Sequence, residues 1–176
     1  MVPVADRALD VYLNDHLGGA TLGSDLAVQI RKRSEGTPLG AVMDQVAPQI
    51  EEDRQTLIDL MEVLDVAKNP AKQASAWLAE KASRVKFGGA ASGEPDFSLF
   101  MAVETMSLGV RGKLKLWEAM KELPAAHPVH HAVDLDELIA RAQWQHDRLE
   151  EQRVAIAPAV LDEGVSRVGE ARLGLL

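Results

Sequence analysis

A chain of 176 residues is long enough for one domain with a sizeable core. Hydrophobic residues make up 47% of it but aromatic residues only 4%, which favours a helical protein over a β-sandwich. The absence of cysteine excludes disulfides, thiolate metal ligands and cysteine nucleophiles, and the net charge of −8 argues against nucleic acid as the main partner.

The sequence offers no candidate for a targeting or membrane-spanning segment. The first residues include Asp6 and Asp10 and lack the apolar stretch of a signal peptide. No run approaches the roughly 20 apolar residues that a helix needs to cross a bilayer. We therefore expect a cytoplasmic protein that binds neither a membrane nor nucleic acid.

Apolar residues at helical spacing predict a first helix over residues 5–34. His16 falls on the apolar stripe of this helix, where an ionisable group is costly unless it is paired or bound to a metal. Gly18, Gly19 and Gly23 lie in the same helix, although each mid-helix glycine costs about 0.5–1 kcal/mol relative to alanine. The expected reason is close approach of another helix, and the alternative is a local bulge beside a functional site.

A second helix is predicted over residues 38–66. Thr37 is a suitable N-cap for it, and Pro38 is favourable in its first turn. Asp53 falls in the middle of the apolar stripe of this helix, one turn away from apolar residues on either side. A carboxylate at such a position needs a partner.

Residues 67–95 are predicted to form a long connection that contains a short amphipathic crossover helix at 71–85. At about 1.5 Å per residue, this helix would span about 22 Å. That length carries the chain from one end of a bundle to the other and makes the flanking helices parallel. The third helix is predicted over residues 96–123, and in it Glu104 and Arg111 share one apolar face.

The fourth helix is predicted over residues 134–157, with His146 on its inner stripe and Pro158 kinking or ending it. Residues 165–176 are expected to form a C-terminal tail, as a short docked helix or a frayed end. A single helical-bundle domain then covers residues 1–164.

The predicted helices carry the segments LNDHLGGA, QIEEDRQTL, NPAKQASAWLAEKASRVK, VETMSLGVRGKLKLW and QWQHDRLEEQ. In architecture and spacing, these segments resemble the ferritin-like superfamily, and in particular its small bacterial members of unknown function. The resemblance implies an all-α fold: an up-down-down-up four-helix bundle with a crossover helix. Di-iron sites of this kind take one glutamate from each of two helices and a Glu-x-x-His pair from each of the other two.

The chain departs from this di-iron pattern on three of its four helices. His16 stands where the first helix should offer a glutamate, and the best-placed carboxylate of the second helix is Asp53. Glu104 matches the pattern, while Gln143-x-x-His146 keeps the histidine without the carboxylate. These departures argue against two-metal oxidase chemistry.

We therefore predict that the inward ionisable residues form a buried polar cluster in which an arginine replaces the missing cation. Two alternatives stay open. The residues are either unrelated and individually satisfied, or they bind a single divalent metal ion such as iron, manganese or zinc. The predicted cluster comprises His16, Asp53, Glu104, Arg111 and His146, and the alternative metal ligands are His16, Asp53, Glu104 and His146.

Three of the five histidines lie in the predicted loop between the third and fourth helices, at His127, His130 and His131. Imidazoles this close together can bind Zn²⁺ or Ni²⁺ at a surface. An ordinary polar loop is the alternative.

Other catalytic signatures are missing, including a glycine-rich phosphate loop, a nucleophile elbow and an HExxH motif. The sequence therefore favours a non-enzymatic protein, structural or stress-associated, with a degenerate metal site and no cofactor. The alternative is a mononuclear metal-binding protein or oxidoreductase. The apolar helix faces allow a homodimer, and nothing in the sequence indicates a small-molecule ligand.

Overall fold

The computed structural model describes residues 8–68 and 95–173, and within these ranges it contains helices and no strands. The predicted all-α fold class is therefore confirmed. The predicted crossover helix at 71–85 lies outside the described residues. The helices are α1 (Ala8–Arg33), α2 (Pro38–Val63), α4 (Pro95–Lys121), α5 (Val129–Ala132) and α6 (Leu135–Leu173).

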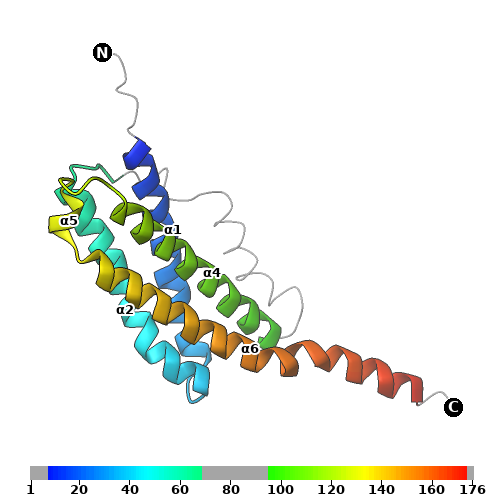
Figure 1. The fold of residues 1–176 in the computed structure, drawn as a ribbon. Helices are drawn as coiled ribbons and strands as arrows, with labels where there is room; N and C mark the ends of the chain where they lie inside the picture. Colours follow the sequence, from blue (N-terminus) through cyan, green and yellow to red (C-terminus); the bar gives the residue numbers. More distant parts are fainter. Residues whose placement is uncertain (1–7, 69–94, 174–176) are drawn as a thin grey trace.

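Each of the four long helices packs against two others that run antiparallel to it (Figure 1). The end of α1 meets the start of α4, where the Arg33 guanidinium donates to the Ser98 hydroxyl at 3.3 Å. The end of α4 meets the start of α6, where Lys121 pairs with Asp136. Helices α2 and α4 consequently run in the same direction, and α1 and α6 run in the opposite one.

A tight turn joins α1 to α2. Gly36 takes a positive φ of 77°, which glycine adopts without a steric penalty. Thr37 caps α2 as predicted, because its hydroxyl accepts a hydrogen bond from the backbone N–H of Gly40 at 3.1 Å. The same hydroxyl donates to the carbonyl of Ser34 at 2.6 Å. The predicted start of this helix, with Thr37 as N-cap and Pro38 in the first turn, is therefore confirmed.

Two apolar clusters form the core, and α2 contributes to both. One cluster includes Leu57 and Trp117, and the other includes Ile50 and Val103. Asp53 lies on α2 between Ile50 and Leu57, which belong to different clusters. Its buried carboxylate is therefore at the boundary between the two apolar clusters. This position requires compensating polar partners from the neighbouring helices.

Helix α6 is longer than predicted and extends beyond the other helices (Figure 1). It contains Pro158 and continues to Leu173, so residues 165–173 prolong the helix instead of forming a separate tail. Proline leaves the carbonyl four residues earlier without its usual donor. That residue, Val154, is exposed, so water can satisfy the carbonyl and the helix can continue.

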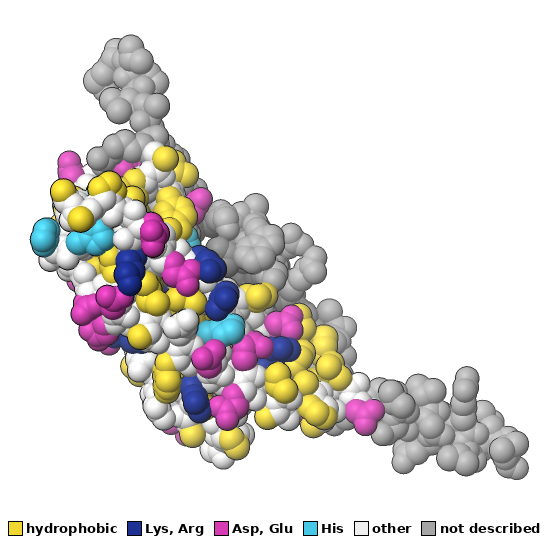
Figure 2. All heavy atoms as spheres, viewed as in Figure 1, with side chains coloured by type: hydrophobic (Ala, Val, Ile, Leu, Met, Phe, Trp, Pro, Cys, Tyr) yellow, Lys and Arg dark blue, Asp and Glu magenta, His cyan; other side chains and the backbone are white. Residues whose placement is uncertain are grey.

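The surface around α4 and α6 carries charges of both signs. On the face drawn in Figure 2, acidic and basic side chains alternate, and hydrophobic side chains gather where α4 begins. Phe97 and Val154 are among the exposed hydrophobic residues of these two helices. Of the helices described, none is both long enough and apolar enough to cross a membrane.

Candidate functional site

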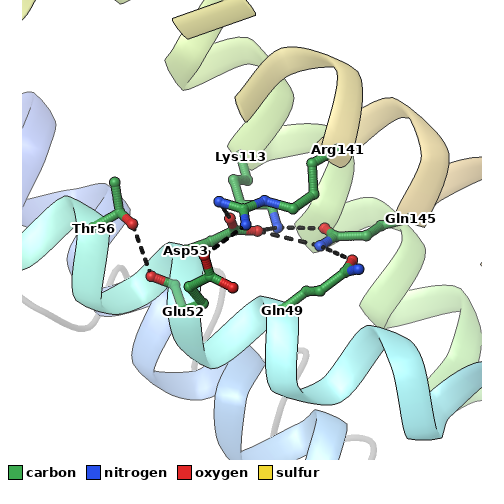
Figure 3. A network of polar contacts seen from close by, with 7 residues as sticks. All are labelled: Gln49, Glu52, Asp53, Thr56, Lys113, Arg141 and Gln145. Carbon is green, nitrogen blue, oxygen red and sulfur yellow. Dashed lines mark hydrogen bonds and ion pairs between the residues drawn. The ribbon is translucent and has the colours of Figure 1, made fainter. Parts of the chain in front are cut away.

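The polar centre of the bundle is the carboxylate of Asp53, whose side chain is only 2% exposed (Figure 3). Its Oδ2 pairs with the ammonium group of Lys113 from α4. Its Oδ1 lies 2.8 Å from the Nη2 of Arg141 from α6. Three helices therefore meet at this one carboxylate, and two positive charges compensate it.

Gln145 of α6 is fully buried and links the members of this centre. Its side-chain oxygen accepts a hydrogen bond from Lys113 at 2.5 Å. Its Nε2 donates to the side-chain oxygen of Gln49 at 3.0 Å and to Asp53 Oδ2 at 3.3 Å. The amide thus uses both its donor and its acceptor to hold α2, α4 and α6 together.

A second carboxylate completes the charge balance. Glu52 lies next to Asp53 on α2 and is 63% exposed, and its Oε1 lies 2.8 Å from the Nη1 of Arg141. The two carboxylates and the two cations sum to zero charge. We call the set Gln49, Glu52, Asp53, Lys113, Arg141 and Gln145 the ionic network.

Burial and pairing act in opposite directions on the two cations of the ionic network. Burial lowers the pKa of Lys113 from its ordinary value, although the adjacent charge of Asp53 acts to raise it. Burial also acts to lower the pKa of Arg141, but the hydrogen bond to Glu52 and the charge of Asp53 outweigh it and raise the pKa. Arg141 therefore remains charged at every physiological pH.

Of the five residues predicted to form the polar cluster, only Asp53 belongs to the ionic network. Arg111 is exposed, and Glu104 is partly exposed and lies 3.6 Å from Arg153. His146 lies beside Asp147, with Nδ1 at 3.3 Å from its Oδ1. The structure therefore does not form the predicted cluster, because Arg111 is exposed and the other two side chains contact Arg153 and Asp147 instead of Asp53.

His16 occupies a different position from the other predicted members. Its ring is half-buried on α1 and stands edge-on to the ring of Tyr12, with the centroids 4.6 Å apart. Burial lowers its pKa, while the charge of Asp15 acts in the opposite direction. His16 lines the same cavity as Asp53, but no contact joins the two among the described residues.

The alternative metal sites are not assembled either. In the described part of the chain, no group of three or more histidines and carboxylates is placed to hold a metal ion. His130 contacts the Leu123 carbonyl at 3.0 Å, and the Nδ1 of His127 accepts from the N–H of Val129 at 3.3 Å. His131 is exposed. His127 and His130 therefore serve the local turn around α5, a short helix that the sequence did not predict.

The sequence contains a signal for the residues that were missed. Gln145 lies seven residues after the buried Leu138 and four before the buried Leu149, which is the spacing of an inward stripe. Lys113 lies three residues after the buried Val110 and four before the buried Trp117 on α4, which is also the spacing of one helix face. The sequence prediction placed His146 instead of Gln145 on the inner stripe. This error of one residue corresponds to a rotation of α6 by about 100°.

A cavity of about 380 Å³ adjoins the ionic network. Its described lining comes from α1, α2 and α4 and includes Asp53 and Lys113. Most of the remaining lining is apolar. The network therefore has one side facing a space that can admit a small molecule.

Together, the fold and the site define a class: an all-helical protein with an ionic network buried between three helices of its bundle. In comparisons with family models, with curated proteins and with solved structures, this chain matches none of them.

Proposed function

We propose that this chain is a non-enzymatic, ferritin-like bundle whose polar centre is held by the protein's own cations in place of a metal. The observation that carries this proposal is the pairing of the buried Asp53 with both Lys113 and Arg141. The parallel course of α2 and α4, with α1 and α6 antiparallel to them, supports the up-down-down-up topology.

The donor set around Asp53 does not fit a metal ion. Divalent metals in such bundles are held by several carboxylates and histidines that converge on one point. Here each oxygen of the buried carboxylate already faces a cation, and both cations would repel an incoming metal. The side chains that would have to join Asp53, namely Glu104 and His146, contact Arg153 and Asp147 instead.

The role that follows for the ionic network is structural. A buried ion pair is a weak source of stability, because desolvation opposes the attraction, but it strongly disfavours arrangements that leave one charge unpaired. Asp53, Lys113 and Gln145 come from three different helices. Sliding or rotating any one of these helices would leave a buried charge without its partner. The network therefore fixes the register of the three helices.

Elemental analysis of untagged protein tests the proposal directly. After incubation with Fe²⁺, Mn²⁺ or Zn²⁺ and desalting, we expect no stoichiometric metal and no change in the thermal midpoint. A stoichiometric metal that is lost in Asp53→Asn would overturn the proposal. Metal that persists in Asp53→Asn but is lost when His127, His130 and His131 are changed to alanine would lie at the surface and leave the proposal intact.

A further inference from the structure

The cavity beside the ionic network has an apolar wall and an opening to the surface. Its apolar lining includes Leu22, Leu26, Ile50, Leu57, Met106 and Val110. Leu108 also lines it and is exposed, which marks the side on which the cavity reaches solvent. Its volume of about 380 Å³ lies within the range of small-molecule sites.

Glycines keep this cavity wide. Gly19 and Gly23 of α1 and Gly109 and Gly112 of α4 all line it. A Cβ built at Gly23, Gly109 or Gly112 meets no atom within 4 Å, so packing against the described structure does not require glycine there. Each mid-helix glycine still costs about 0.5–1 kcal/mol relative to alanine. At Gly23, close helix approach, the reason expected from the sequence, therefore does not hold.

One hydrogen-bond donor in the lining lacks an acceptor among the described residues. Trp117 is fully buried and lines the cavity, and among the described residues its indole N–H has no acceptor. A buried donor without an acceptor costs about 1–3 kcal/mol. The indole has no exposed surface in this structure, so an acceptor on a bound molecule removes this cost only after the side chains that cover the indole shift.

The charged groups of the lining are either paired or exposed to solvent. Asp15 and Asp25 of α1 line the cavity and are exposed, so their carboxylates are hydrated and disfavour an anion. Asp53 and Lys113 neutralise each other at its inner side, and Arg54 pairs with Glu51 at 2.6 Å. Burial lowers the pKa of His16, which keeps this ring neutral at pH 7. Away from these two exposed carboxylates, the lining therefore offers apolar surface and the buried indole donor of Trp117.

We propose that this cavity binds a neutral, largely apolar molecule with one hydrogen-bond acceptor. The molecule lies against the side of the cavity formed by Gly19, Gly23, Gly109 and Gly112, here called the glycine wall, and accepts from the indole of Trp117. This ligand site goes beyond the structural role proposed for the ionic network and does not depend on it. A metal found at Asp53 would leave the ligand site standing, and a failure to bind ligand would leave the network standing.

Nile red, a neutral planar dye with a carbonyl acceptor, tests the site by fluorescence titration of the full chain. We expect one saturable site, from which 1-octanol displaces the dye and octanoate does not. The absence of saturable binding would overturn the proposal. Equal displacement by octanoate would also overturn it, because the lining would then accept an anion.

Alanine at the glycine wall separates binding from stability. In Gly109→Ala/Gly112→Ala, we expect a higher thermal midpoint but roughly tenfold weaker dye binding, because two methyl groups enter the cavity. The matched control is Val28→Ala, an exposed change on α1 that also improves helix propensity and leaves the cavity untouched. If the double variant binds the dye as tightly as this control, the glycine wall is not part of a ligand site.

The indole donor is tested by Trp117→Phe, with Trp144→Phe on the outside of α6 as its control. Loss of one hydrogen bond predicts roughly fivefold weaker dye binding in Trp117→Phe and unchanged binding in Trp144→Phe. Equal binding by the two variants would contradict the role of the indole. The alanine variants of the glycine wall decide the matter if Trp117→Phe does not fold.

Discussion

Lys113 of α4 holds its ammonium group against the carboxylate of Asp53 on α2, which lies 60 residues earlier in the chain. The Asp53 side chain is 2% exposed and that of Lys113 is 16% exposed, so both charges are largely removed from water. Either charge alone at this depth would be costly. The pair therefore links the positions of two helices that are distant in sequence.

Removing the cation of this pair should strongly destabilise the fold. For Lys113→Met we expect a loss of roughly 2–3 kcal/mol, because a charge remains buried while Arg141 still compensates part of it. The matched control is Lys115→Met, since Lys115 is 61% exposed and pairs with Glu118 at the surface. That change should stay within about 1 kcal/mol. Urea denaturation measures both, and equal losses would contradict the burial argument.

Arg141 and Arg111 should contribute very differently to the stability of the bundle. Arg141 is 15% exposed and contacts both Asp53 and Glu52, so Arg141→Leu should cost roughly 1–3 kcal/mol. Arg111, which the sequence placed in the cluster, is exposed, and Arg111→Leu should change stability by no more than about 0.5 kcal/mol. A larger loss from Arg111→Leu than from Arg141→Leu would favour the cluster predicted from sequence.

His16 should make stability depend on pH. Burial lowers its folded-state pKa below the ordinary value of 6.5. Above that value the ring is neutral in both states and its contribution is complete. As the pH falls below 6.5, the unfolded state takes up the proton first, so stability declines until the folded pKa is reached.

Thermal midpoints at about pH 7.5 and about pH 5.5 measure this effect. The wild type should lose more stability between these two values than His16→Gln does. His131→Gln, a change at an exposed histidine, should keep the wild-type profile. Identical profiles for the wild type and His16→Gln would show that His16 is not buried in its neutral form.

Two glycine-to-alanine changes should have opposite signs. A Cβ at Gly40 would lie 2.2 Å from the backbone oxygen of Ser34, which cannot move aside without disturbing the turn into α2. We therefore expect Gly40→Ala to cost roughly 1–3 kcal/mol. At Gly23 the Cβ enters open space, and Gly23→Ala should stabilise by about 0.5–1 kcal/mol. Guanidinium denaturation distinguishes them, and a stabilised Gly40→Ala would refute the account of this turn.

Local signals predicted the helices well because they act within a few residues. Thr37 and Pro38 fixed the start of α2, and apolar spacing located the four long helices. Helix α5 has only four residues, which is too short for a periodic pattern to show. The continuation of α6 past Pro158 depends on solvent reaching an exposed turn, which sequence spacing does not reveal.

The candidate site was harder to predict, because it depends on how each helix is rotated. Asp53 was identified correctly as a buried carboxylate, since its apolar neighbours lie symmetrically around it. His146 was predicted to face the core in place of Gln145, because an error of one residue in the helical periodicity is enough to exchange the two. Lys113 was missed although it lies within one turn of the buried Val110 and Trp117, because a lysine is ordinarily assigned to the surface. Its long apolar stem nevertheless allows the charge to reach a partner inside the bundle.

The central claim is that Asp53 is neutralised inside the bundle by cations of the protein itself. A double-mutant cycle of Asp53→Asn and Lys113→Met, followed by urea denaturation, tests this claim most directly. The account predicts that the double variant loses less stability than the two single variants combined, by about 1–3 kcal/mol. Strictly additive losses would contradict it, because they would show that the two charges do not depend on each other.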